Sequence, residues 1–325
     1  MEYRRLGKSG LQVSVLSLGS WLTFGKQIEN QVAEELMQVA YENGVNFFDN
    51  AEIYSKGQSE IVMGNILKKM NWDRSTYLVS SKVFWGGDKP NQKGLSRKHV
   101  IEACHGALKR LQVEYLDMYF CHRYDMNTPI EETVRAMETL IQQGKILYWG
   151  TSEWNSGEIM EAHAVAKDLR ITPPTMEQPQ YHMFERYAVE VDYQRAYQRG
   201  LGTTTWSPLA SGLLSGKYND GVIPADSRLA MEGLEWLRDK TLLDAHIEKV
   251  RQLSTVAEEI GCTMPQLALA WCVRNPNVST VILGASKVSQ LTENLKCLEI
   301  VPKLTPEVLE KIENILQNKP SRVLY

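Results

Sequence analysis

The feature that most constrains this chain is an alternation of short apolar runs with segments of helical period, repeated along its length. Such alternation is typical of βαβ units, in which each helix packs back on a parallel sheet. Several runs are almost wholly apolar, as expected for strands covered on both faces. The eight expected strands are residues 15–19, 45–49, 77–82, 116–122, 146–152, 175–178, 202–207 and 280–284. Eight parallel strands are the number that closes a barrel.

Two of the expected helices are well marked. The first follows Ser96 as its N-cap. Its apolar face is formed by Val100, Cys104, Ala107, Leu108 and Leu111. The second is expected to start at Pro129, with Thr128 as cap, Glu131 completing a capping box and Gly144 ending it.

No linker, charge block or solenoid repeat divides the chain, so we expect one domain over residues 1–325. A Gly-Lys-Ser-Gly turn at 7–10 predicts an N-terminal hairpin, and residues 210–236 read as an insertion. The expected fold class is α/β, a (β/α)8 TIM barrel with an N-terminal hairpin and extra C-terminal helices. An open doubly wound sheet would instead require an early G-x-G-x-x-G turn, which is absent from the sequence.

The composition is that of an ordinary globular protein, with 43% hydrophobic and 23% charged residues and a net charge of −3. It argues against disorder and against nucleic-acid binding. No apolar run is long enough for a membrane helix, and no apolar leader follows the first residues, so we expect a cytoplasmic protein without membrane insertion. Five scattered cysteines and six histidines lack the spacing of metal ligands, so we expect reduced thiols and no metal.

Polar residues close several of the expected strands. In a parallel barrel the carboxyl ends of all strands meet at one rim, which carries the active site. Asp49, Lys82 and His122 stand at successive strand ends, and Tyr54 follows on the same rim. Each of them alone is better explained as a turn residue, a solvated cation, a core imidazole or a rim aromatic. Together they favour a site, because a desolvated Lys82 needs a carboxylate and Asp49 can supply it.

This group suits proton donation to a carbonyl oxygen. An adjacent ammonium favours the phenolate, so we expect Lys82 to lower the pKa of Tyr54 and make it a general acid. A neutral His122 would orient the carbonyl and stabilise charge on its oxygen. The residues alone leave the reductant unidentified.

Residues 44–54, together with the G-x-S-E motif at 57–60, resemble the signature of the aldo-keto reductases. Further matches occur in the order of that family at 111–117 leading to His122, 144–146, 150–152, 177–179 and 206–209. Segments 20–25, 84–87, 94–99, 180–184 and 283–286 are most similar to the branch that contains voltage-gated potassium channel beta-subunits. The mammalian beta-subunits have Asn at the position of His122, whereas this chain has the full tetrad of active reductases.

The resemblance implies NADPH/NADP+ as cofactor, with hydride leaving nicotinamide C4 and Tyr54 giving the proton. It implies that Ser152 and Gln178 bond the nicotinamide amide, that Trp206 stacks on its ring and that Lys217 pairs with the pyrophosphate. Other cofactor contacts implied by the resemblance are Ser20, Trp21, Gln27, Asp49, Ser207, Pro208, Leu209, Ser211, Gly212 and Gly284. The adenosine 2′-phosphate would be held by Arg228, Ser286, Lys287 and Gln290, and the adenine by Glu293 and Asn294.

Two features of the sequence refine these implied contacts. No acidic residue lies in the loop 284–287, which starts a helix, so NADPH is favoured over NADH. Glu153 departs from the Asn or Arg that most relatives carry beside the nicotinamide.

The expected activity is therefore reduction of small aldehydes or ketones. Trp21, Tyr54, Phe84, Trp85 and Trp154 are candidates for an aromatic substrate pocket. The sequence ends soon after the helix expected near 306–317, which predicts an open site and broad substrate acceptance.

Two alternatives of other classes remain. One is an accessory subunit that binds NADPH and docks on a channel or another protein. The other is a barrel hydrolase or isomerase that uses Asp49 or His122 as a base. Homo-oligomers occur in the branch, and the sequence fixes neither a stoichiometry nor an interface.

Overall fold

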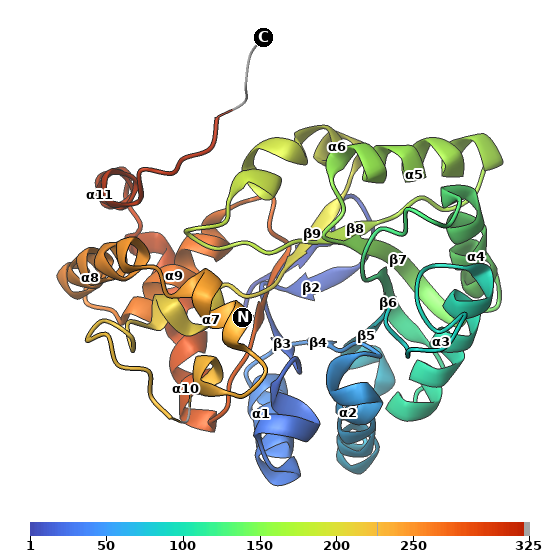
Figure 1. Cartoon of the computed structure of the whole chain (residues 1–325), viewed down its shortest axis with the longest axis horizontal. Coiled ribbons are helices and arrows are strands. Elements are labelled where there is room, and N and C mark those ends of the chain that lie inside the picture. Colours follow the sequence, from blue (N-terminus) through green and yellow to red (C-terminus); the bar gives the residue numbers. More distant parts are fainter. Residues whose placement is uncertain (226, 322–325) are drawn as a thin grey trace.

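The computed structural model describes residues 1–225 and 227–321, and its centre is a closed barrel of parallel strands (Figure 1). The strands follow one another around the barrel in chain order, and β10 pairs with β3 to close it. They are β3 (Leu16–Gly19), β4 (Phe47–Asp49), β5 (Leu78–Val83), β6 (Leu116–Cys121), β7 (Ile146–Ser152), β8 (Met176–Gln178), β9 (Gly202–Thr205) and β10 (Thr280–Leu283). The predicted eight-stranded barrel is confirmed, although some strands are shorter than the apolar runs.

The predicted N-terminal hairpin is also confirmed, and it covers one end of the barrel. Strands β1 (Tyr3–Arg5) and β2 (Gln12–Ser14) pair antiparallel. Leu6 and Val13 of this hairpin belong to the same buried cluster as strand residues such as Phe47 and Ile282. A guanidinium nitrogen of Arg4 donates to the carbonyls of Val273 (2.7 Å) and Val278 (2.9 Å). The hairpin thus ties the first residues of the chain to the segment that leads into β10.

Helices surround the strands in chain order (Figure 1). They are α1 (Asn30–Glu42), α2 (Gln58–Met70), α3 (Arg97–Leu111), α4 (Ile130–Gln142), α5 (Ser156–Leu169), α6 (Gln194–Arg199), α7 (Glu235–Thr241), α8 (Asp244–Glu259), α9 (Met264–Arg274), α10 (Val288–Leu295) and α11 (Pro306–Leu316). The apolar face predicted for α3 is buried. Ser96 caps this helix, because its side chain accepts from the His99 amide.

The predicted start of α4 needs a correction. The N-cap is Pro129 rather than Thr128, and no side chain bonds the free amides there. The Thr128 hydroxyl instead donates to Asp125 (2.7 Å), while Glu131 pairs with Arg135 one turn later. The Thr128 side chain is therefore bonded to the loop before α4 and accepts no bond from the first turn of the helix.

The predicted insertion lies between β9 and α8. It contains the short 3-10 segments η5 (Ala210–Ser215) and η6 (Arg228–Ala230) and part of α7. In Figure 1 these yellow and orange segments lie on the same side of the barrel as α10. The insertion therefore shares that side of the barrel with the helix expected to hold the adenosine end of the cofactor.

The extra C-terminal helix is held by a buried arginine. Arg186 makes ion pairs with Glu190 (3.0 Å) and with Glu313 of α11 (2.8 Å).

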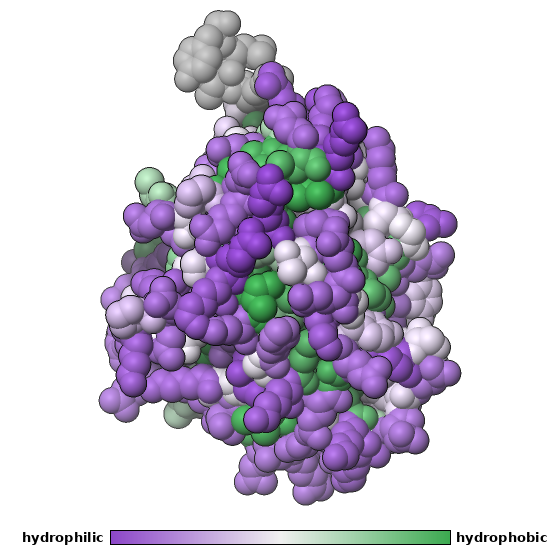
Figure 2. Space-filling view, turned by 90° about the vertical axis from the view of Figure 1, so that its right-hand side faces the viewer, coloured by the Kyte–Doolittle hydropathy of each residue, from purple (hydrophilic) through white to green (hydrophobic). Residues whose placement is uncertain are grey.

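Figure 2 shows one face of the molecule as a largely hydrophilic surface with separate apolar patches. Over residues 1–225 and 227–321, no helix is long and apolar enough to cross a membrane.

Candidate active site

A cavity of about 940 Å³ opens where the carboxyl ends of the strands meet. Most residues singled out in the sequence line it, namely Trp21, Gln27, Asp49, Tyr54, His122, Ser152, Gln178, Trp206, Ser207, Pro208, Leu209, Ser211, Gly212, Lys217, Arg228, Gly284, Ser286, Gln290, Glu293 and Asn294. Ser20, Lys82 and Lys287 are not in the lining. The buried Ser20 donates to the Asp49 carbonyl (3.0 Å), so it supports the wall from behind.

Lys82 lies beneath the cavity floor with no exposed surface. Its Nζ donates to Asp49 Oδ2 (2.7 Å), to the Asn50 carbonyl (2.8 Å) and to the Tyr54 hydroxyl (3.2 Å). The other oxygen of Asp49 accepts from Ser80 (2.8 Å) and from the Gln178 amide (3.2 Å). The expected Lys82–Asp49 ion pair is therefore present, and hydrogen bonds complete it as a buried pair requires.

The pKa of Tyr54 moves in the direction opposite to the prediction. Burial, and then the charge of Asp49, raise this pKa well above 10, against a smaller lowering by Arg123. Burial and the Asp49 charge thus outweigh the effect expected of Lys82, whose own pKa is lowered, first of all by burial. The phenol consequently keeps its proton at neutral pH, which suits a proton donor better than a phenolate would.

His122 follows β6 and is 7% exposed. Burial, then the charges of Lys82 and Arg123, hold its pKa well below the usual 6.5, so the ring is neutral. Its Nδ1 has no hydrogen-bond partner among the described residues. The ring centroid lies 5.9 Å from that of Tyr54 and 5.0 Å from that of Trp85. A neutral imidazole in this place can bond a polar atom that enters the cavity.

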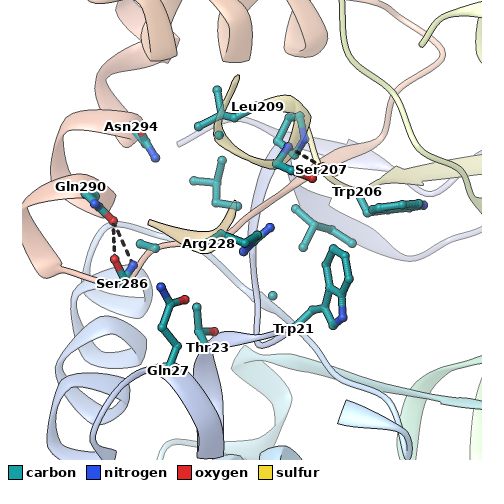
Figure 3. Close-up of a pocket in the computed structure, with 18 of the residues that line it drawn as sticks. Trp21, Thr23, Gln27, Trp206, Ser207, Leu209, Arg228, Ser286, Gln290 and Asn294 are labelled. Carbon is teal, nitrogen blue, oxygen red and sulfur yellow. Dashed lines mark hydrogen bonds between the residues drawn. The ribbon is translucent and has the colours of Figure 1, made fainter. Parts of the chain in front are cut away.

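Trp206 is fixed by Glu153, the residue that departs from the family pattern. The indole nitrogen donates to Glu153 Oε1 (2.8 Å), which also accepts from the Gln180 amide (2.6 Å). Glu153 has a positive φ of 58°, a backbone conformation that few non-glycine residues adopt. Trp21 meets Trp206 edge to face, with centroids 5.7 Å apart (Figure 3). One carboxylate oxygen thus links the ends of β7, β8 and β9 and sets the orientation of Trp206.

The far end of the cavity has a buried cation in its wall. Figure 3 shows Arg228 between the Trp21–Trp206 pair and the corner where Ser286 bonds Gln290. The guanidinium lies 5.3 Å from the Trp21 ring, and no ion pair joins it to another described residue. Burial lowers the pKa of Arg228 from its usual value. A desolvated cation with no acidic partner among residues 1–225 and 227–321 fits a phosphate group.

The aromatic substrate pocket is only partly as predicted. Trp21, Tyr54 and Trp85 line the cavity. Trp154 is 1% exposed and packs against Tyr124 in the core. Phe84 lies outside the lining and packs against Trp85. The two exclusions show that an aromatic residue near the rim can face the core instead of the cavity.

Several lining residues were missed by the sequence reasoning, among them Thr23, Arg123, Ser215, Pro224, Ser227, Trp236, Thr263, Pro265, Leu269 and Ser289. The sequence does contain a signal for Arg123, because this residue directly follows His122 at the end of an expected strand. Trp236 belongs to the insertion, whose path the strand pattern does not determine. Over the described ranges, no group of three or more His, Cys, Asp or Glu residues is arranged to hold a metal ion.

Known proteins similar to this chain cover nearly all of it. The model of the "Aldo/keto reductase family" matches residues 15–317. A protein of Arabidopsis thaliana named "Probable voltage-gated potassium channel subunit beta" is 51% identical over 323 residues, which are 99% of this chain and 98% of that protein. A protein of Oryza sativa subsp. japonica with the same name is 52% identical over 323 residues, with the same coverage. The chain therefore belongs to the aldo/keto reductase family.

Proposed function

We propose that this protein is an NADPH-dependent reductase of small aldehydes and ketones. The observation that carries the proposal is the contact of a protonated Tyr54 with the buried Lys82–Asp49 pair. The far end of the same cavity has Arg228, which forms no ion pair within residues 1–225 and 227–321. The first feature supplies a proton donor, and the second fits a phosphate-bearing cofactor. When bound, NADPH would supply the hydride.

Different residues of the cavity would bind different parts of the cofactor. Ser152 and Gln178 would hold the nicotinamide amide, with Trp206 against its ring. Lys217 and the η5 segment would meet the pyrophosphate. Arg228, Ser286 and Gln290 would hold the 2′-phosphate, and Glu293 and Asn294 the adenine. These assignments rest on family membership and on the lining of one continuous cavity.

The catalytic residues would act on the carbonyl oxygen. The Tyr54 hydroxyl donates its proton to that oxygen as negative charge develops there. Lys82, 3.2 Å from the phenol oxygen, stabilises the phenolate left behind, and Asp49 keeps Lys82 in place. Neutral His122 donates a hydrogen bond to the same oxygen and fixes the direction of the carbonyl.

The test is NADPH oxidation with a panel of small aldehydes, for the wild type and Tyr54→Phe, with NADH as the control cofactor. We expect Tyr54→Phe to lower kcat by about 1,000-fold, within the range for loss of a general acid. NADPH should still quench its tryptophan fluorescence. If the wild type binds NADPH but reduces no aldehyde, the enzyme proposal is wrong.

A second candidate is an accessory subunit of a channel that binds NADPH with little turnover. The printed names of the two plant relatives favour it, since they match 99% of this chain. Cofactor binding without turnover, together with copurification of a membrane partner, would support this candidate over the enzyme.

A further inference from the structure

We propose that Arg123 forms a subsite for a carboxylate group on the carbonyl substrate. The preferred substrates would be aldehydes or ketones that carry an acid group away from the reacting carbon. The inference rests on the proposed reductase function and names the substrate class of the same site.

The position of Arg123 supports this subsite. It directly follows His122 and lines the same cavity as Tyr54 and Trp85. Its guanidinium carbon lies 5.2 Å from the Trp85 ring centroid, which is 5.0 Å from that of His122. The cation therefore lies in the same part of the cavity as His122 and within reach of the Trp85 ring. A substrate whose carbonyl meets Tyr54 would extend along Trp85 towards Arg123.

The hydrogen bonds of Arg123 leave capacity for a ligand. One guanidinium nitrogen donates to the His122 carbonyl at 2.5 Å, which anchors the side chain. No other hydrogen bond joins the guanidinium to the rest of residues 1–225 and 227–321, and no ion pair does. Guanidinium donors in a planar fork match the two oxygens of a carboxylate.

Acidic residues at or after the ends of β4 and β6 have partners other than Arg123. Asp49 is paired with Lys82. Glu52 accepts from the Phe84 amide (2.8 Å), and Asp125 accepts from the Leu95 amide (2.8 Å). Among residues 1–225 and 227–321, none of these carboxylates forms an ion pair with Arg123, so its charge is available to a bound anion. That charge also reaches the reacting groups, because it lowers the pKa of Tyr54 and of His122.

The alternative is that Arg123 only packs on Trp85, as a cation over an aromatic ring. Two aldehydes separate the two roles. The two compounds are 4-carboxybenzaldehyde and 4-nitrobenzaldehyde, which have similar planar shapes. Only the first is an anion at neutral pH. A packing role changes kcat/KM for both alike, whereas a carboxylate subsite changes their ratio.

The experiment measures that ratio for the wild type, Arg123→Met and Arg123→Lys. Arg123→Met keeps a long side chain against Trp85, and we expect it to lower the ratio of kcat/KM, carboxylate over nitro, by about 10- to 100-fold. The loss should fall mainly on KM for the carboxylate. Arg123→Lys should restore part of it. Arg135→Met is the matched control, because Arg135 lies on α4 outside the cavity and pairs with Glu131.

Calorimetry of benzoate binding to the NADP+-loaded protein gives a measurement that does not depend on turnover. We expect Arg123→Met to weaken this binding by a similar factor. An unchanged ratio, or an equal loss with both aldehydes, would overturn the subsite. If the wild type reduces neither aldehyde but still binds benzoate through Arg123, the reductase proposal fails while the subsite stands.

Discussion

The two ends of the cavity treat their charges in opposite ways. At the catalytic end, Lys82 and Asp49 form a complete buried pair that also holds Tyr54. At the far end, Arg228 lies in the wall without an acidic partner among the described residues. The first end has both charges of its ion pair, whereas the second has a positive charge with no ion pair among residues 1–225 and 227–321.

This difference separates what stabilises the protein from what binds its ligand. A buried pair is costly to break, because the remaining charge stays desolvated. A lone desolvated cation already costs free energy, which a bound anion returns. Substitutions at the two ends should therefore change the stability of the unliganded protein in opposite directions.

The largest effect is expected at the catalytic end. Lys82→Met leaves the Asp49 carboxylate buried and unpaired, so we expect the free energy of unfolding to fall by about 3 to 5 kcal/mol. Chemical denaturation would measure this loss. The control is Lys82→Met combined with Asp49→Asn, which removes both charges and should recover most of it. If the double variant is as unstable as the single one, the charge is not the cause.

The next effect should have the opposite sign. Arg228→Met removes a buried cation that has no ion pair among the described residues, so the unliganded protein should be at least as stable as the wild type in thermal unfolding. Its affinity for NADPH should fall by about 10- to 100-fold, as for loss of a hydrogen-bonded charge. NADH, which lacks the 2′-phosphate, should be affected much less. A parallel loss of stability and of affinity for both cofactors would break the comparison.

A pH series tests the catalytic end more finely. The pKa of His122 is well below 6.5 in the folded protein, whereas the unfolded chain takes up the proton below about pH 6.5. The unfolded state then binds more protons, so stability is complete above about pH 6.5 and falls as the pH drops. We expect a slope of up to about 1.4 kcal/mol per pH unit for this histidine.

His182 adds to the same trend, because burial first of all lowers its pKa to about 3. Denaturation curves at about pH 7 and pH 5 would show the slope, and His122→Asn should reduce it while leaving the His182 share. Equal slopes for the wild type and this variant would show that His122 does not remain neutral. Because the pKa of Tyr54 is raised, kcat should show no ionisation of the phenol between pH 6 and 8.

The smallest effect concerns the indole between the two ends. Glu153→Ala removes the acceptor that holds Trp206, and we expect NADPH affinity to fall by about 3- to 10-fold, as for one hydrogen bond. Glu153→Gln keeps an acceptor oxygen and should stay near the wild type. Trp206→Phe and Glu153→Ala should be non-additive in affinity, because both remove the same contact. Full additivity would show that Glu153 acts by another route.

The sequence predicted the barrel, and it predicted that Asp49, Tyr54 and Lys82 lie together, for a simple reason. Each strand is visible as a short apolar run in the sequence. Because the carboxyl ends of all strands of a parallel barrel meet at one rim, the residues that end the runs are expected to be neighbours. The direction of the Tyr54 pKa was wrong, because burial and the Asp49 charge depend on packing that no local pattern encodes. The predicted cap of α4 was wrong as well, since the helix begins one residue later and Thr128 bonds Asp125 of the preceding loop.

The far end shows a different limit. Arg228 and Gln290 come from segments far apart in the chain. No local pattern predicts that they lie together, and only the family resemblance implies it. The prediction that Trp154 lines the pocket was wrong, because an aromatic residue near the rim can point either into the cavity or into the core. Arg123 was missed although it directly follows His122.

The hairpin contact of Arg4 bears on how the chain is made. Arg4 reaches a carbonyl 274 positions later in the sequence, and β3 pairs with β10, so the barrel closes through its most distant partners. During synthesis the four tetrad residues emerge within the first half of the chain, long before β10 exists. Until then β3 has an unpaired strand edge, which invites contact with other chains. The barrel therefore cannot close before Thr280–Leu283 of β10 have been synthesised, although the four tetrad residues are present long before.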